Sequence, residues 1–127
     1  MIVASDSKSK VSSYKDLLVW KRSIELATNI FAVTKNYPKE QQYGLVSQIE
    51  RSAVSIASNI AEGAGRKGKK EFVQFVSIAR GSLFELETQL IISEQTGFIN
   101  KEKLNYFIKE IDEIGKMLSG LKRSLET

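Results

Sequence analysis

Histidine and cysteine are both absent from this chain of 127 residues. Without cysteine there is neither a disulfide framework nor thiolate chemistry, and the composition fits a reducing compartment. Without histidine the commonest general base and the commonest metal ligand are missing together. The carboxylates Glu62, Glu85, Glu87 and Asp112 show no spacing typical of metal ligands. We therefore expect no enzyme activity, no metal and no cofactor.

Long apolar runs are also missing. No run approaches the roughly 20 residues that a membrane-spanning helix needs. The amino-terminal sequence MIVASDSKSK lacks the apolar core of a signal peptide. We therefore expect a soluble, cytoplasmic protein that does not bind membranes.

Proline occurs once, at Pro38, and apolar residues recur at intervals of three and four. This period predicts an all-α chain. Residues 1–13 are polar and lack the period, so we expect a mobile amino-terminal tail followed by one helical domain over residues 14–127. The first helix should cover about residues 14–36, and a second should begin near Pro38, because proline suits a first helical turn.

Glycine and asparagine mark the remaining helix ends. The second helix should stop around Gly63, because glycine closes a helix in the left-handed conformation at no steric cost. A third helix should run from near Lys69 to Gly97, and Asn100 is a good N-cap for a fourth. Short connections make neighbouring helices antiparallel, so the sequence predicts an up-down-up-down four-helix bundle.

The first helix is more apolar than one packing seam requires, with two stripes roughly 120° apart. The stripe that we expect to face the core comprises Leu17, Trp20, Ile24, Ala27 and Phe31. The surplus stripe comprises Val19, Leu26, Ile30 and Val33, and the third helix carries a similar surplus of Val73, Phe84 and Ile91. Exposed apolar patches usually mark interfaces, so these stripes predict self-association through both helices. The alternative is a wider core in a monomer.

The segment GAGRKGKK, residues 63–70, approaches two phosphate-binding motifs. Its glycines have the spacing of a dinucleotide-binding loop, and it matches a P-loop until Lys70, where serine or threonine should stand. Both motifs work only after a β-strand, which aims the amide hydrogens at the phosphate. The preceding residues are helical in pattern, so we interpret the segment as a turn between the second and third helices.

The turn is rich in cations, which oppose the dipole at the start of a helix and so do not serve helix stability. Up-down topology places the turn at the same end as the amino-terminal tail and the end of the fourth helix; we call this the basic end. Its bases are Lys8, Lys10, Lys15, Arg66, Lys67, Lys69, Lys70, Lys116, Lys122 and Arg123, and its acids are Asp6, Asp16, Glu62, Glu71 and Glu126. The basic end therefore carries a net charge of +5, against −1 for the rest of the chain.

A surface of this kind attracts phosphate backbones with an affinity that depends on salt. The candidate nucleic-acid-binding residues are Arg66, Lys67, Lys69, Lys70, Lys122 and Arg123. Tyr14 and Phe72 are the few aromatic residues near this end, and Phe72 fits the core pattern, so backbone or shape recognition is favoured over base stacking. The alternative function is a protein-interaction scaffold, such as a polymerase-accessory subunit, whose basic end meets an acidic partner.

A polar ridge runs along the second helix, formed by Ser52, Ser55, Asn59 and Glu62. With the hairpin turning near Lys67, Ser55 should approach Ala79, and Arg51 should reach Glu85 or Glu87 and pair with one of them. Asn59 should bond to a neighbouring helix or to the glycine turn. We interpret this ridge as structural, fixing the register of the second and third helices.

The segments SIASNIAEGAGR and EFVQFVSIARGSLFELETQL, together with YKDLLVWKRSIELA near the start, resemble the four-helix-bundle family of 23S rRNA-intervening-sequence proteins. Accessory variability determinants of diversity-generating retroelements are relatives of that family. The resemblance extends from Tyr14 to about Leu125. Ala57 stands where family members often have proline, and this departure should leave the fold undisturbed, since alanine is the better helix former.

The resemblance implies a ring-like homopentamer with a central opening, in bacterial cytoplasm. It also implies association with nucleic acid, RNA in particular, because some relatives are encoded within ribosomal RNA genes and others assist a reverse transcriptase. Asn59, Glu62, Gly63 and Gly65 are family-signature positions and should be structural rather than catalytic. Arg66 should be the signature position most exposed to a ligand.

Overall fold

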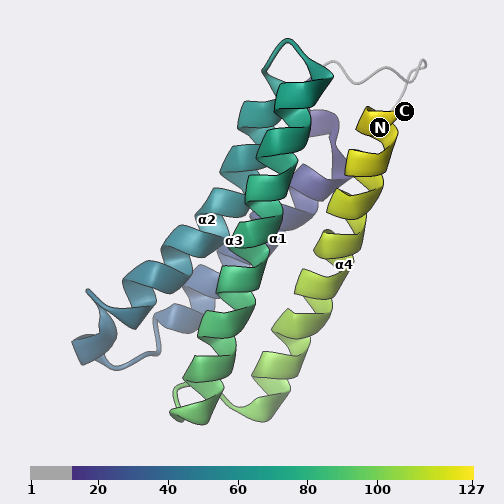
Figure 1. Cartoon of the computed structure of the whole chain (residues 1–127). Coiled ribbons are helices and arrows are strands. Elements are labelled where there is room, and N and C mark those ends of the chain that lie inside the picture. The colour runs from purple at the N-terminus through teal and green to yellow at the C-terminus, as the bar shows by residue number, and fades with distance from the viewer. Residues whose placement is uncertain (1–12) are drawn as a thin grey trace.

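The computed structural model describes residues 13–127, and this part of the chain is entirely helical (Figure 1). Its long helices are α1 (Leu18–Thr34), α2 (Leu45–Ala64), α3 (Lys69–Gln95) and α4 (Lys101–Glu126). Two short 3-10 helices, η1 (Tyr14–Asp16) and η2 (Lys39–Gln41), precede α1 and α2. The predicted all-α fold with four helices is confirmed. Of the predicted tail, residues 1–12 lie outside the described residues, and Ser13 caps η1 by accepting a hydrogen bond from the Lys15 amide at 3.1 Å.

The four helices pack as a bundle in which α3 lies between α2 and α4, while α1 packs against α2 and α4. Figure 1 shows the α2–α3 turn and the carboxyl end of α4 at one end of the molecule, and the α3–α4 turn at the other. The core is apolar and draws on every long helix. Its fully buried large side chains include Leu26, Ile30, Ile56, Ile60, Leu83, Leu86, Leu90, Phe107, Ile114 and Leu118.

The second helix begins later than predicted. Pro38 has an extended ψ of 143°, and it starts only the 3-10 turn η2. The chain then bends at Gly44, with φ −118° and ψ −105°, before α2 begins at Leu45. The prediction was wrong because proline at a first turn is equally compatible with a single turn of 3-10 helix.

The end of α3 and the start of α4 are confirmed as predicted. Gly97 has a φ of +85°, the left-handed conformation that glycine adopts without strain. Three residues later, the side chain of Asn100 accepts a hydrogen bond from the Lys103 amide at 2.8 Å, which satisfies one of the free amides of the first turn.

The predicted core stripe of α1 is confirmed only in part: Leu17, Trp20 and Ala27 pack half-buried against the core, but the fully buried face is the stripe that was predicted as surplus. Val19, Leu26 and Ile30 are buried, whereas Ile24 and Phe31 are 40% and 39% exposed. The buried face also includes Ser23, whose hydroxyl donates to the Val19 carbonyl at 2.7 Å and is thereby satisfied inside the helix. Because Ser23 interrupts the apolar pattern of the true core face, periodicity favoured the other stripe.

On α3 the predicted surplus stripe is exposed at two of its three positions. Val76, Ala79, Leu83, Leu86 and Leu90 are buried. Phe84 and Ile91 of the surplus stripe are exposed by 56% and 39%, while Val73 is half-buried. Both α1 and α3 thus present large apolar side chains on the surface.

Gly63 does not end α2, which continues to Ala64. It is buried inside the helix, and a Cβ atom at this position would lie 2.7 Å from Cβ of Phe75 and 2.9 Å from Cδ1 of Phe72. The glycine is therefore required for close packing of α2 on α3 rather than for a left-handed backbone, which corrects the reason given for it above.

Candidate nucleic-acid interface

The segment GAGRKGKK forms the predicted turn between two helices. Gly65 caps the carboxyl end of α2 with helical dihedral angles, and Gly68 precedes the first residue of α3. Lys67, Lys69 and Lys70 are all exposed on this turn. No strand precedes the turn in the described part of the chain, so its amides are not arranged as in a dinucleotide-binding loop or a P-loop.

Arg66 is held in place rather than free on this turn. Its Nη2 lies 2.7 Å from Oε2 of Glu62, and its Cζ lies 5.0 Å from the centre of the Phe75 ring. The side chain is 44% exposed. These residues of α2 and α3 therefore act together: Gly63 lets Phe75 approach α2, and Phe75 and Glu62 both contact the side chain of Arg66.

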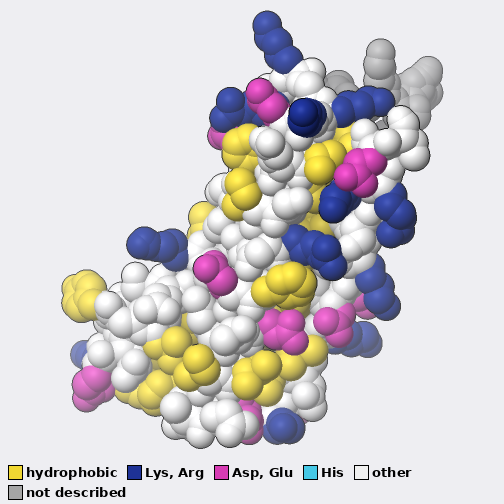
Figure 2. Space-filling model, viewed as in Figure 1, with side chains coloured by type: hydrophobic (Ala, Val, Ile, Leu, Met, Phe, Trp, Pro, Cys, Tyr) yellow, Lys and Arg dark blue, Asp and Glu magenta, His cyan; other side chains and the backbone are white. Residues whose placement is uncertain are grey.

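The carboxyl end of α4 brings further cations to the same end of the bundle. Lys122 is half-buried and Arg123 is exposed. Figure 2 shows Lys and Arg side chains around the α2–α3 turn and along α4, with large hydrophobic side chains lower on this face. The expected contributions of Lys8, Lys10 and Asp6 lie outside the described residues.

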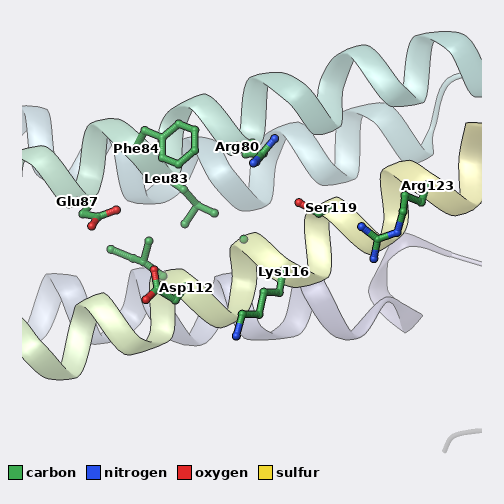
Figure 3. A pocket seen from close by; sticks show the side chains of 10 residues that line it. Arg80, Leu83, Phe84, Glu87, Asp112, Lys116, Ser119 and Arg123 are labelled. Carbon is green, nitrogen blue, oxygen red and sulfur yellow. The ribbon is translucent and has the colours of Figure 1, made fainter.

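A groove lies between α3 and α4 beside the basic end. Two adjoining hollows form it, and both are lined by Arg80, Phe84 and Ser119. Lys116 and Arg123 line the first hollow, which has a volume of about 340 Å³, and Lys122 lines the second. We call this surface the α3–α4 groove. Figure 3 shows Arg80, Ser119 and Arg123 toward one end of it, whereas Glu87 and Asp112 lie toward the other and Lys116 points away from α3.

Phe84 gives the α3–α4 groove an exposed aromatic ring. Cζ of Arg80, one helical turn earlier, lies 5.5 Å from the centre of that ring, a distance typical of cation–π contact. The sequence predicted Phe84 as part of an apolar stripe and placed few aromatic residues near the basic end. The spacing of Arg80 and Phe84 was a usable signal, but the residues of α4 that complete the groove begin at Ile111, 27 positions beyond Phe84.

Ser55 and Asn59 of the polar ridge on α2 form hydrogen bonds within the bundle, but their partners differ from those predicted. The Ser55 hydroxyl lies 2.9 Å from that of Ser82 on α3, three residues beyond the predicted neighbour. Asn59 donates to the carbonyl and hydroxyl oxygens of Ser55, at 2.8 and 2.9 Å, rather than to another helix or to the turn. The turn lies at residues 65–68, as predicted, but successive positions on one face of a helix are three or four residues apart, so the side chain that faces Ser55 can lie three residues from the position that counting from the turn gives.

The predicted ion pair of Arg51 is not formed. Within residues 13–127, Arg51 makes no salt bridge to Glu85 or Glu87. Arg51 and Glu85 are exposed, while Glu87 lines the α3–α4 groove on the side of α3 that faces α4. The prediction was wrong because counting residues from the turn gives the level along α3 that a residue of α2 reaches. It does not give the side of either helix on which the side chain lies.

An ion-pair cluster that the sequence did not indicate joins α1 to α4. Nη2 of Arg22 lies 2.9 Å from Oε1 of Glu110 and 2.7 Å from Oε1 of Glu113. Its hydrogen bonds to Glu113 and Glu110 raise the pKa of Arg22 further above its ordinary value, and the bond from Arg22 lowers the pKa of Glu113. The partners are about 90 residues apart in the chain, so no local spacing could reveal them.

No helix of residues 13–127 is both long and apolar enough to cross a bilayer. Over the same range, no three Asp or Glu side chains are grouped closely enough to hold a metal ion.

The fold and this site define a four-helix bundle with a cationic end. The family model described as 23S rRNA-intervening sequence protein matches residues 15–120, and the chain belongs to that family. Among solved structures, it is similar to the crystal structure of a protein with unknown function from the S23 ribosomal protein family of Bacteroides thetaiotaomicron. The two are 28% identical with a TM-score of 0.77, and the match covers 83% of this chain and 98% of the other. No curated protein matches the chain significantly.

Proposed function

We propose that this chain is a non-enzymatic, oligomeric nucleic-acid-binding protein that contacts RNA through phosphates at its basic end. The observation that carries the proposal is the gathering of Lys67, Lys69 and Lys70 on the α2–α3 turn, at the end of the bundle where α4 also ends (Figures 1 and 2). These cations oppose the dipole of α3, so helix stability does not account for them.

Two further cations extend the surface. Lys122 and Arg123 lie in the last turns of α4, where they also complement the dipole of that helix. Arg66 is pre-oriented by Glu62 and Phe75, so little side-chain freedom would be lost when its remaining donors meet a phosphate. The family description, which refers to ribosomal RNA, favours RNA over DNA.

The oligomeric part of the proposal rests on exposed apolar side chains. Ile24 and Phe31 on α1, and Ile91 and Ile92 on α3, are each 39% to 46% exposed. We propose that up-down-up-down bundles associate through these two helices into a closed ring of identical subunits, five by resemblance to the family, in the bacterial cytoplasm. A ring would repeat the basic end around one axis and merge the copies into a broad cationic face.

The test is a charge reversal with a matched control. Replacing Lys67, Lys69 and Lys70 together by Glu should abolish binding to a 23S rRNA fragment in a mobility-shift assay at low salt. The control reverses Lys39, Lys101 and Lys103, which are equally exposed but lie on other turns of the bundle. The control variant should retain binding, and its affinity should fall with salt as steeply as that of the wild type. For any variant, each phosphate contact that is lost should reduce the slope of log affinity against log salt concentration by about one.

Two outcomes would contradict the proposal. If the triple variant binds RNA as the wild type does, and circular dichroism shows the same helical content, the basic end does not bind RNA. A partner protein that is retained by the wild type after nuclease treatment, and lost from the same variant, would favour the alternative of a scaffold or polymerase-accessory subunit. That role would also fit the resemblance to accessory variability determinants.

A further inference from the structure

The α3–α4 groove combines an exposed ring with cations. Phe84 is 56% exposed, and Arg80 holds its guanidinium over the ring at 5.5 Å. Proteins hold single-stranded nucleic acid with this combination, because bases stack on aromatic rings or guanidinium planes while cations contact the phosphates. We propose that the groove binds an unpaired base of single-stranded RNA, stacked on Phe84. The inference rests on the proposed function. It adds that the RNA is single-stranded and that one of its bases lies on Phe84.

The groove continues the basic end rather than forming a separate site. Lys122 and Arg123 belong to the basic end, and each lines a hollow that Arg80 and Phe84 also line. A strand whose phosphates contact the α2–α3 turn therefore meets further cations where α3 and α4 diverge. The first hollow, at about 340 Å³, is at the small end of ligand pockets and suits a single planar group.

The charges of the groove also give it a direction. Glu87 and Asp112 lie toward the end remote from Arg80 and Arg123 (Figure 3). Carboxylates repel phosphates, so the backbone runs from the basic end as far as Phe84 and does not continue past these two residues. The groove accordingly takes one base from the strand and leaves the neighbouring nucleotides to the basic end.

A second copy of this chain is a poorer occupant of the groove. Ile24 and Phe31, the large apolar side chains exposed on α1, carry no charge, and the exposed acid beside them, Glu25, already lies 4.0 Å from Arg22. Covering the groove with this face would remove water from three cations, Arg80, Lys122 and Arg123, and bring only this one acid to them, which is unfavourable. A nucleotide supplies an aromatic face and a phosphate together.

The test compares two oligoribonucleotides of about ten residues with the full-length protein: oligouridylate, and the same strand with abasic sites, which keeps the phosphates. The wild type should bind oligouridylate about tenfold more tightly, and Phe84→Leu should bind the two strands equally. Phe84→Tyr keeps the ring and should keep the preference. Tyr43→Leu, which removes an exposed ring from the connection before α2, should behave as the wild type.

Each outcome has one reading. If Phe84→Leu keeps the preference for bases, the stacking proposal is wrong while binding by the basic end stands. If the triple glutamate variant loses binding to both strands while Phe84→Leu binds them as the wild type does, the basic end binds RNA and the stacking proposal is wrong. If the wild type binds neither strand, the proposed function fails as well. A change of subunit number in Phe84→Leu, measured by light scattering, would assign the groove to a second copy instead.

Discussion

Nη2 of Arg22 on α1 lies 2.7 Å from Oε1 of Glu113 on α4, and the same nitrogen reaches Glu110 at 2.9 Å. This pair is the shortest charged contact between the first and last helices of the bundle. Figure 1 shows that α1 and α4 are the helices farthest apart in the sequence, so the contact closes the bundle. It is partly exposed, since the two side chains are accessible by 23% and 43%.

The Arg22–Glu113 contact predicts a loss of stability in acid. Arg22 lowers the pKa of Glu113 below its ordinary value of about 4.3. A carboxyl whose pKa is lower in the folded state stabilises that state above its unfolded pKa and ceases to do so as the pH falls through the folded pKa. The melting temperature of Glu113→Gln should therefore fall less than that of the wild type when the pH is lowered from about 7 to about 3. Glu25→Gln, which removes a 4.0 Å contact of a 70% exposed side chain, should follow the wild type more closely.

The contact of Gly63 with Phe75 predicts that even one methyl group is harmful there. A Cβ at Gly63 would lie 2.7 Å from Cβ of Phe75, and that atom cannot move without the backbone of α3. Gly63→Ala should lower the free energy of unfolding by about 1–3 kcal/mol, measured by urea denaturation. Gly81→Ala is the control, because nothing lies within 4 Å of its Cβ. It should raise the free energy of unfolding by about 0.5–1 kcal/mol, since alanine is the better helix former.

The exposed stripe on α1 predicts a change of subunit number. Replacing Ile24 and Phe31 together by Asp should lower the mass measured by light scattering toward that of one chain of 14.3 kDa. The reason is that an apolar interface does not tolerate unpaired charges. Tyr43→Asp, at a side chain 95% exposed in the connection before α2, should leave the mass unchanged. An unchanged mass for the double variant would show that α1 is free in solution.

Local signals in the sequence predicted the helix ends well. Asn100 caps α4 and Gly97 ends α3 because both act within a few residues, through one hydrogen bond and one backbone conformation. Pro38 was less informative, because a proline allows a 3-10 turn as readily as an α-helix. Gly63 was placed at the right end of α2 for the wrong reason, since the need for a small residue comes from Phe75 on another helix.

Features that join distant segments could not be predicted in the same way. Periodicity found two apolar stripes on α1 but did not show that Leu26 faces the core and Phe31 does not, because the choice depends on α2 and α4. The basic surface at the α2–α3 turn could be predicted because its cations lie within a few residues of one another in the sequence. The α3–α4 groove did not, since Phe84 becomes part of it only when Ser119 and Lys122 are brought alongside.

The carboxyl end of α4 and the α2–α3 turn lie at the same end of the bundle (Figure 1). A purification tag or fluorophore fused after Thr127 would consequently lie at the same end as the α2–α3 turn and obstruct the RNA-binding surface that we propose there. A polyhistidine tail would also add imidazoles that titrate near neutral pH to a chain that has none. Labels attached at the α3–α4 turn, near Gly97, avoid both artefacts and leave the opposite tip unobstructed.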